Sequence, residues 1–124
     1  MKISVVIPAY QEAAIIGSVI ESVTSILPDA EIIVVDDGSK DTTAEAARTA
    51  GAVVFSHPYN IGNGAAVKTG IRMAKGDLVI LLDADGQHNP QDIPRLLAEA
   101  ETHDMVVGAR SPTYAGQLFK EVRQ

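Results

Sequence analysis

Two aspartates, Asp83 and Asp85, follow an apolar run that ends at Leu82. Such a run predicts a buried strand, and α/β proteins gather their functional side chains beyond the carboxyl ends of such strands. Residues i and i+2 of an extended segment project to the same side, so both carboxylates could bind one hard cation that prefers oxygen ligands, Mg²⁺ or Mn²⁺. Taken alone, the triplet fits a pair of solvated turn aspartates equally well.

The composition restricts the classes of function. The chain has 124 residues, 46% of them hydrophobic and 21% charged, which is typical of one soluble globular domain. It contains no cysteine, so disulfides and thiolate metal sites are excluded. A net charge of −6 without a Lys/Arg cluster argues against nucleic-acid binding, and a phosphorylated ligand would need a cation as intermediary. Because no secretory signal or membrane-length apolar stretch is evident, we expect a cytoplasmic protein that could still lie against a membrane face through another segment.

Short aliphatic runs, mostly continuous rather than alternating, predict strands that are buried on both faces. Helical patterns separate these runs, and Asn89-Pro90 favours one more helix start. The alternation predicts an α/β fold with an open, doubly wound, mostly parallel sheet whose central strand order is 3-2-1-4. The predicted strands lie at 3–7, 32–35, 53–55, 78–82 and 105–107, and the helical patterns at 15–27, at 42–50 and around Val67.

Two loops bear on which α/β class this is. The loop after the first strand, Pro8 to Glu12, lacks the glycines of a dinucleotide-binding fingerprint and the glycine- and arginine-rich loop expected of a nucleotidyltransferase. Gly62-Asn63-Gly64 matches a phosphate-binding loop only weakly, and a glycine turn that enters a helix explains it better.

The second helix has Asp41 or Ser39 as candidate N-terminal caps and Gly51 as its stop.

Acidic residues follow the first, second and fourth predicted strands. A carboxylate at Asp36-Asp37 could accept a hydrogen bond from the ring N–H of a base, while Tyr10 and Pro8 offer apolar contact. Each is ambiguous by itself, because Glu12 could favour a helix N-terminus and the Asp pair could form a turn. In a parallel sheet these loops share the carboxyl edge, which predicts one site.

Four blocks of sequence stand out, which are VVIPAYQE from Val5, IVVDDGSKDTT from Ile33, GNGAA from Gly62 and DADGQH from Asp83. Together they resemble the family 2 glycosyltransferases of GT-A fold. Within that family the chain is most similar to polyprenyl-phosphate sugar transferases of the dolichyl-phosphate mannose synthase and bactoprenol glucosyltransferase type. The similarity runs from residue 3 to about residue 111, with Gln11 where asparagine is commoner.

The resemblance implies a role for individual positions. It places Pro8, Tyr10 and Glu12 in the nucleotide pocket, and Val35 and Asp37 against the nucleobase. It assigns the triplet from Asp83 to Asp85 to the diphosphate and the metal. It also implies that Gln87 is an added metal ligand and that Arg110 meets the donor. No catalytic base is assigned, because the loop histidine His88 fits a turn or supporting role as well. The implied binding residues are Pro8, Tyr10, Glu12, Val35, Asp37, Asp83, Ala84, Asp85 and Arg110, and the metal ligands are Asp83, Asp85 and Gln87.

The implied reaction moves a hexose from a nucleotide diphosphate sugar, of the GDP-mannose or UDP-glucose type, to a polyprenyl phosphate. The resemblance implies inversion, divalent-metal dependence with Mg²⁺ or Mn²⁺, and a hexosyltransferase of EC 2.4 type. A half-domain that binds the nucleotide sugar without transferring it is the alternative.

The last residues have a different pattern. We expect residues 1–110 to form the nucleotide-sugar-binding domain and 111–124 to be a tail that starts an acceptor-side segment outside this chain. The tail has no strand pattern, and Leu118, Phe119 and Val122 could mark one face of a short helix. An apolar surface left beside the last strand would favour a homo-oligomer or a membrane-associated partner.

Overall fold

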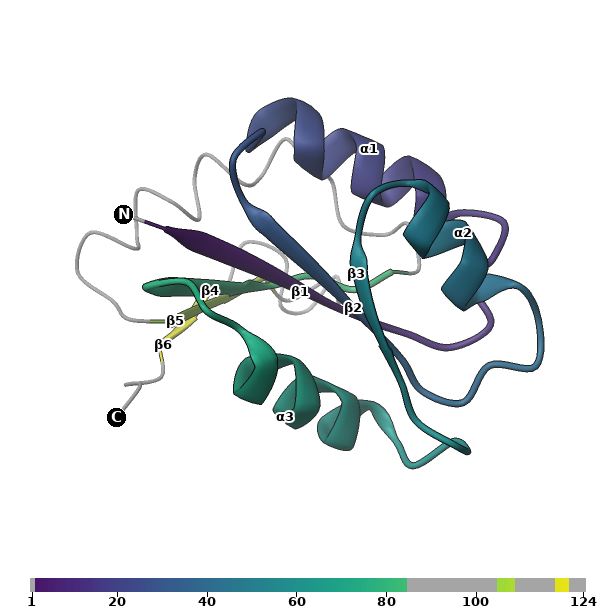
Figure 1. Ribbon diagram of the computed structural model, residues 1–124. Coiled ribbons are helices and arrows are strands. Elements are labelled where there is room, and N and C mark those ends of the chain that lie inside the picture. The colour runs from purple at the N-terminus through teal and green to yellow at the C-terminus, as the bar shows by residue number, and fades with distance from the viewer. Residues whose placement is uncertain (1, 85–104, 109–117, 121–124) are drawn as a thin grey trace.

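The computed structural model describes residues 2–84, 105–108 and 118–120, the last two segments by their backbone alone. Figure 1 shows a central sheet with helices on both faces. The elements in chain order are β1 (Ile3–Ala9), α1 (Ile16–Ile26), β2 (Glu31–Asp36), α2 (Thr43–Thr49), β3 (Val53–Ser56), α3 (Asn63–Met73), β4 (Leu78–Leu81), β5 (Met105–Gly108) and β6 (Leu118–Lys120).

The sheet has the order β3-β2-β1-β4-β5-β6, which confirms the predicted central order 3-2-1-4. The strands from β3 to β5 pair in parallel, and β6 pairs antiparallel with β5. In Figure 1, α1 and α2 cover one face of the sheet and α3 covers the other. The carboxyl ends of β1, β2 and β4 therefore meet at one edge, where the acidic loops begin.

The central strands have an apolar core on each face. Successive side chains of a strand point to opposite faces, so Val5 and Ile7 of β1 pack with α1, whereas Val6 packs with α3. All three are fully buried. Burial on both faces explains why the sequence of a parallel strand reads as an unbroken aliphatic run.

Strand β1 extends two residues beyond the predicted end, through Pro8 and Ala9. The carbonyl of Ala9 accepts a hydrogen bond from Asp37 on the β2 side, so position 8 faces the β4 side. The pairing of β1 with β4 has already ended at Val6. The sheet therefore loses no hydrogen bond through the missing N–H of proline.

The edges of the sheet differ from the expectation. The prediction that every strand is buried on both faces is wrong for β3, because it is an edge strand and Val53 is 50% exposed. The expectation of a short helix around Leu118 and Phe119 is also wrong: these residues belong to β6, which pairs with the backbone edge of β5. A three-residue strand is too short to show the period of two in its sequence. The helix expected after Asn89-Pro90 lies outside the described residues.

Local signals placed the ends of two helices. The prediction of Asp41 or Ser39 as the N-cap of α2 is wrong, because the cap position is Thr42, whose side chain makes no capping hydrogen bond. Asp41 lies one residue earlier, and its Oδ1 accepts a hydrogen bond from the Thr43 backbone N–H at 3.0 Å. Gly51 has a φ of 103° just after that helix, which confirms it as the stop. Gly62, with a φ of 131°, precedes α3 and confirms the glycine turn. No helix in the described stretches is both long and apolar enough to cross a bilayer.

Two glycines of α3 allow a matched test of how tightly the helix packs on β1. A Cβ added at Gly70 would lie 2.2 Å from Cγ1 of Val6, whereas one at Gly64 would meet nothing within 4 Å. We expect Gly70→Ala to lower the free energy of unfolding by about 1–3 kcal/mol through overpacking. Gly64→Ala should leave it unchanged or raise it by about 0.5–1 kcal/mol, because alanine favours helix. Urea unfolding measures both, and equal effects of the two variants would contradict this packing.

Candidate functional site

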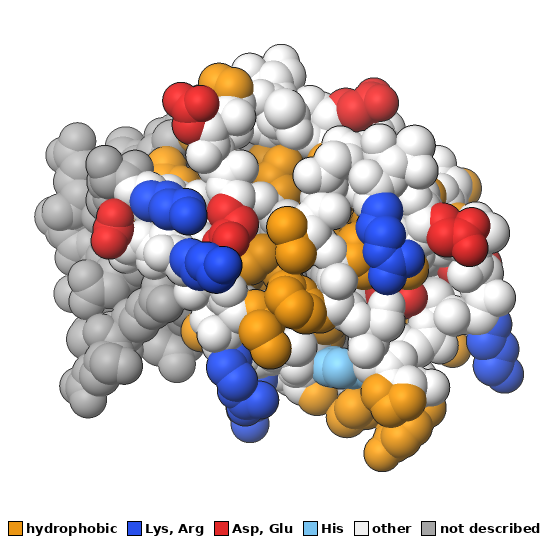
Figure 2. Space-filling model, in the orientation of Figure 1, with side chains coloured by type: hydrophobic (Ala, Val, Ile, Leu, Met, Phe, Trp, Pro, Cys, Tyr) orange, Lys and Arg blue, Asp and Glu red, His pale blue; other side chains and the backbone are white. Residues whose placement is uncertain are grey.

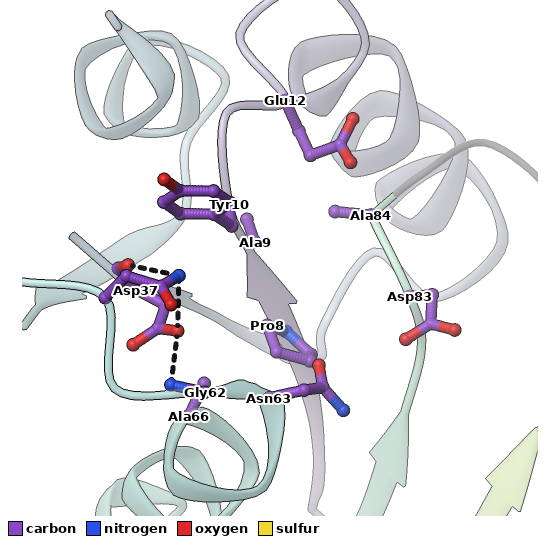
Figure 3. Close-up of a pocket in the computed structure, with 11 residues that line it drawn as sticks. Pro8, Ala9, Tyr10, Glu12, Asp37, Gly62, Asn63, Ala66, Asp83 and Ala84 are labelled. Atoms are coloured by element: carbon purple, nitrogen blue, oxygen red, sulfur yellow. Dashed lines mark hydrogen bonds between the residues drawn. The ribbon is translucent and has the colours of Figure 1, made fainter. Parts of the chain in front are cut away.

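A cavity of about 600 Å³ lies at the carboxyl edge of the sheet, within the size range of small-molecule sites. Figure 3 shows that its walls come from the first loop, from the end of β2, from the start of α3 and from the residues after β4. The lining residues are Pro8, Ala9, Tyr10, Glu12, Asp37, Asn60, Gly62, Asn63, Ala66, Asp83 and Ala84.

The loop after β1 is held by the segment that leads into α2. The backbone N–H of Gln11 donates to Ser39 Oγ at 2.8 Å, and that of Glu12 donates to Thr43 Oγ1 at 3.0 Å. Gln11 has a φ of 53°, a left-handed conformation that asparagine adopts more readily than most residues. These contacts fix the backbone from which the side chains of Tyr10 and Glu12 extend beside the cavity (Figure 3).

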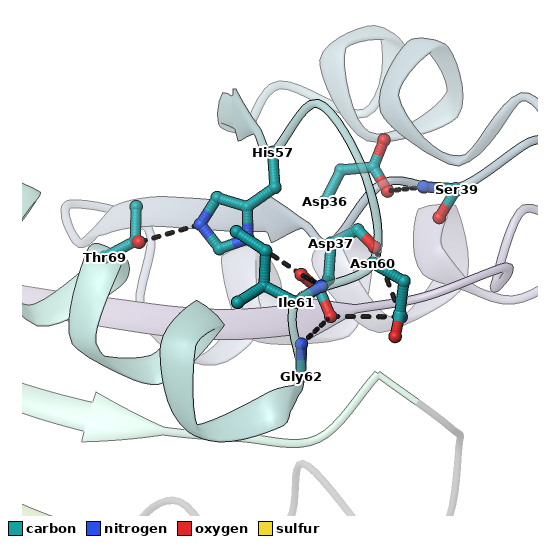
Figure 4. A network of polar contacts seen from close by, with 8 residues as sticks. All are labelled: Asp36, Asp37, Ser39, His57, Asn60, Ile61, Gly62 and Thr69. Carbon is teal, nitrogen blue, oxygen red and sulfur yellow. Dashed lines mark hydrogen bonds and ion pairs between the residues drawn. The ribbon is translucent and has the colours of Figure 1, made fainter.

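The Asp37 carboxylate is 5% exposed and accepts hydrogen bonds from four protein donors (Figure 4). Oδ1 accepts from His57 Nδ1 at 2.7 Å and from the Ile61 N–H at 3.0 Å. Oδ2 accepts from the Gly62 N–H at 2.8 Å and from Asn60 Nδ2 at 3.1 Å. A carboxylate has about four lone-pair positions, so these donors fill the acceptor capacity of Asp37.

The same donors determine the acidity of Asp37. Burial acts to raise the pKa of its carboxyl, but the hydrogen bonds from His57, Ile61 and Gly62 and the field of His57 outweigh burial and lower that pKa below its ordinary value. The backbone N–H groups of Ile61 and Gly62 lie where α3 begins, so Asp37 also supplies the negative charge that favours a helix N-terminus. An anionic ligand would compete with Asp37 for these two groups.

The structure brings together six of the predicted binding residues around one cavity. Val35 does not reach it: this side chain is fully buried in the core beneath α3. Asp85, Gln87, His88 and Arg110 lie outside the described residues. The six that line the cavity are Pro8, Tyr10, Glu12, Asp37, Asp83 and Ala84.

Sequence reasoning missed part of the wall. Asn60, Gly62 and Asn63 line the cavity, although the sequence favours a glycine turn that enters a helix over a phosphate-binding loop at this segment. Ala9 and Ala66 complete the missed set. The place of Asn60, Gly62 and Asn63 in the chain could have identified them, because the segment that follows β3 begins at the same edge of the parallel sheet as the acidic loops.

The charges around the cavity suit a cation between the protein and a phosphorylated ligand. The side chains of Glu12 and Asp83 both face this region (Figure 3), and no Lys or Arg belongs to the described lining. Carboxylate oxygens are the donors that Mg²⁺ and Mn²⁺ prefer, so Asp83 fits such an ion. The described part holds no group of three or more His, Asp or Glu side chains that could bind a metal, and the other two predicted ligands lie beyond it.

Comparison with known proteins gives consistent matches. The model of the family described as "Glycosyl transferase family 2" matches residues 4–124. The undecaprenyl-phosphate 4-deoxy-4-formamido-L-arabinose transferase of Proteus mirabilis is 40% identical over 130 residues, covering 97% of this chain and 40% of that protein. An uncharacterised protein of Methanocaldococcus jannaschii is 40% identical over 116 residues, covering 88% and 46%. The chain thus spans less than half the length of both relatives.

A solved structure extends the comparison to the fold. Glucosyl-3-phosphoglycerate synthase of Mycobacterium tuberculosis, in complex with Mn²⁺, UDP-glucose and phosphoglyceric acid, matches with a TM-score of 0.70 and 34% identity. The match covers 82% of this chain and 40% of that one. Another structure of the same synthase contains Mg²⁺ and UDP. The predicted GT-A fold is therefore confirmed.

The four donors on Asp37 predict a large effect of removing its carboxylate. We expect Asp37→Ala to lower the free energy of unfolding by about 3 kcal/mol, because several buried donors lose a charged acceptor. Asp29→Ala, at an exposed position near the opposite sheet edge, should change it by less than about 0.5 kcal/mol. Urea unfolding at neutral pH compares the two, and a similar small loss in both would contradict the anchoring role.

The lowered pKa of Asp37 predicts a pH dependence. A carboxyl whose pKa is lower in the folded chain than its unfolded value of about 3.9 adds stability above that pH. That contribution is lost as the pH falls through the folded pKa. The stability advantage of wild type over Asp37→Asn should therefore be large at pH 7 and shrink below about pH 4. Urea midpoints across this range measure it, and an advantage that stays constant to pH 2.5 refutes the assignment.

Proposed function

Since this chain belongs to glycosyltransferase family 2, we propose that its cavity binds a nucleotide diphosphate sugar for transfer to a phosphate-bearing acceptor. The observation that carries the proposal is the convergence of Tyr10, Glu12 and Asp83, from two separate loops, on a cavity of about 600 Å³. A concave volume of this size with a few polar groups at fixed places is typical of a small-molecule site.

A uridine nucleotide is the donor that the comparisons favour. The mycobacterial synthase, with 34% identity, was solved with UDP-glucose, and its similarity covers 82% of this chain. In the present structure the Tyr10 side chain is 41% exposed, and its ring lies beside the cavity (Figure 3). An aromatic ring at that position can pack on a base or ribose. Asp37 shapes the same region, but any base N–H must compete with the four donors already on its carboxylate.

The donor diphosphate calls for positive charge that the described lining does not supply. We propose that Asp83, with Asp85 and Gln87, holds Mg²⁺ or Mn²⁺ next to this diphosphate. A bound divalent cation would neutralise charge that develops on the leaving nucleoside diphosphate. Arg110, which follows β5 along the chain, is a second proposed contact for the donor.

In the proposed reaction an acceptor phosphate oxygen attacks the anomeric carbon while the bond from that carbon to the nucleoside diphosphate breaks, with inversion. An acceptor phosphate is already ionised near neutral pH, so the chain mostly has to align the two reactants and exclude water. The Proteus relative is named for an undecaprenyl-phosphate substrate, which supports a polyprenyl phosphate acceptor. The mycobacterial synthase contains phosphoglyceric acid, which makes a small phosphorylated acid the second candidate.

A donor-binding half without transfer activity is the alternative function. It is favoured by length, because the chain covers only 40% of the Proteus transferase and of the mycobacterial synthase. Turnover of UDP-glucose with a polyprenyl phosphate separates the two functions: release of UDP together with a glycosylated lipid supports transfer, and binding without release supports the half-domain.

Calorimetry of the 124-residue chain with UDP and with GDP, each with and without Mn²⁺, tests the donor site. We expect UDP to bind more tightly than GDP, and Mn²⁺ to strengthen UDP binding by about tenfold or more, since ~1.4 kcal/mol of added attraction changes Kd tenfold. Absence of binding by a chain shown to be folded would contradict donor binding by these residues.

Single substitutions test the proposed metal ligand. Asp83→Ala should abolish the strengthening of UDP binding by Mn²⁺, because a carboxylate ligand is lost, and Asp85→Ala should do the same. Asp29→Ala serves as the matched control, since it removes the same charge from an exposed position away from the lining. Calorimetry reads all three variants. An unchanged Mn²⁺ effect in both test variants would show that the metal is held elsewhere.

A further inference from the structure

The connection between β3 and α3 forms a cavity wall that little apolar packing holds in place. Asn60 and Gly62 line the cavity, whereas Tyr59 and Ile61 are 66% and 50% exposed. Figure 2 shows a histidine side chain close to exposed hydrophobic side chains on this face of the molecule. Exposed apolar side chains contribute little to fixing a loop. The wall therefore depends on polar and backbone contacts.

Those contacts come from the end of β2. The loop presents three donors to the Asp37 carboxylate, the N–H groups of Ile61 and Gly62 and the amide of Asn60. The backbone of Tyr59 also packs closely on Gly38: a Cβ at position 38 would lie 2.3 Å from the Tyr59 carbonyl carbon. Gly38 has a φ of 75°, so both its conformation and its contact favour glycine.

His57 links this anchor to the helix beyond it (Figure 4). Its backbone N–H donates to the Asp36 carbonyl at 2.8 Å, which fixes the start of the connection. Its ring Nδ1 lies 2.7 Å from Asp37 Oδ1, and Nε2 lies 2.8 Å from Oγ1 of Thr69 on α3. The carboxylate acceptor indicates that Nδ1 carries a proton and donates, and a threonine hydroxyl can complement Nε2 in either protonation state. Both ring nitrogens are thus used, and the side chain is 12% exposed.

We propose that His57 is a positioning residue for the nucleotide cavity. By holding the Asp37 carboxylate against α3, it sets where Asn60 and Gly62 stand in the cavity wall. His57 does not line the cavity, so its effect on a ligand passes through Asp37. This inference rests on the proposed function for its ligand, but the geometry of the wall can be measured without one.

Two variants that differ by one methylene group separate the contacts of the ring. In His57→Asn the side-chain amide can reach the position of Nδ1 and donate to Asp37. In His57→Gln it reaches toward the position of Nε2 and Thr69 instead. His57→Asn retains only the Asp37 contact and should therefore keep Asn60 and Gly62 in their positions in the cavity wall. His57→Gln retains only the Thr69 contact and should let this wall shift. His57→Ala loses both contacts.

Amide hydrogen exchange of the 124-residue chain without nucleotide reads the wall directly. In His57→Gln and His57→Ala we expect the Ile61 and Gly62 amides to exchange about tenfold faster than in wild type, the factor that one charge-assisted hydrogen bond supports. His57→Asn should stay within about threefold of wild type. The Asp37 amide, which donates to Ala9, reports wider opening of the sheet, and the acceleration at Ile61 and Gly62 should exceed any change at this amide in all variants that fold. If His57→Ala does not fold, the comparison of His57→Asn with His57→Gln still tests whether the contact with Asp37 positions the wall.

Calorimetry with UDP and Mn²⁺ on the same variants gives the functional arm. We expect UDP binding to weaken about tenfold in His57→Gln and to recover in His57→Asn, because the wall moves in the first variant and not in the second. Wild-type exchange rates at Ile61 and Gly62 in His57→Gln would overturn the proposal. Faster exchange in that variant with no UDP binding by wild type would support the positioning of the wall and refute the proposed function.

Discussion

The carboxylate of Asp37 joins two parts of the chain that lie 20 to 25 positions apart in sequence. It directly follows β2, and its oxygens accept hydrogen bonds from the connection between β3 and α3, including the backbone N–H groups just before α3. Buried carboxylates are stable only when such donors replace water. The backbone of the first loop donates hydrogen bonds to Ser39 and Thr43, which follow Asp37 closely in sequence. The cavity walls formed by the first loop, by the end of β2 and by the start of α3 therefore all depend on the end of β2.

The cavity combines this fully hydrogen-bonded carboxylate with Glu12, an acidic side chain that keeps acceptor capacity for a ligand. Within the described part, the Glu12 side chain makes no hydrogen bond or ion pair, and it lies across the cavity from Asp37 (Figure 3). A carboxylate whose acceptor positions are filled by protein donors, as in Asp37, stabilises the fold. A carboxylate that faces the cavity, as in Glu12, can bind a cation or accept a hydrogen bond from a hydroxyl. The carboxylates of Asp37 and Glu12 therefore differ in their surroundings, although both follow predicted strands in the sequence.

Much of the fold could be predicted from the sequence because buried parallel strands leave a strong signal. The runs that became β1, β2 and β4 are aliphatic on both faces, and the loops that follow them had to share one edge. The partners of Asp37 could not be predicted, because His57, Asn60 and Gly62 are 20 to 25 positions away and meet it only after the crossover is built. The burial of Val35 was within reach, since it alternates with Asp36 and shares its face with Ile33, which packs on α3.

We propose that a nucleotide diphosphate and a divalent cation bind at the carboxyl edge of the sheet. Nuclear magnetic resonance of the ¹⁵N-labelled chain, titrated with UDP and diamagnetic Mg²⁺, locates the contact residue by residue. We expect chemical shift changes at the amides of Ala9, Tyr10, Asn63 and Ala84, which line the cavity. We expect none at the hollow around residues 26–30 near the opposite edge of the sheet. Shifts confined to residues 26–30, or no shifts at saturating nucleotide, would contradict it.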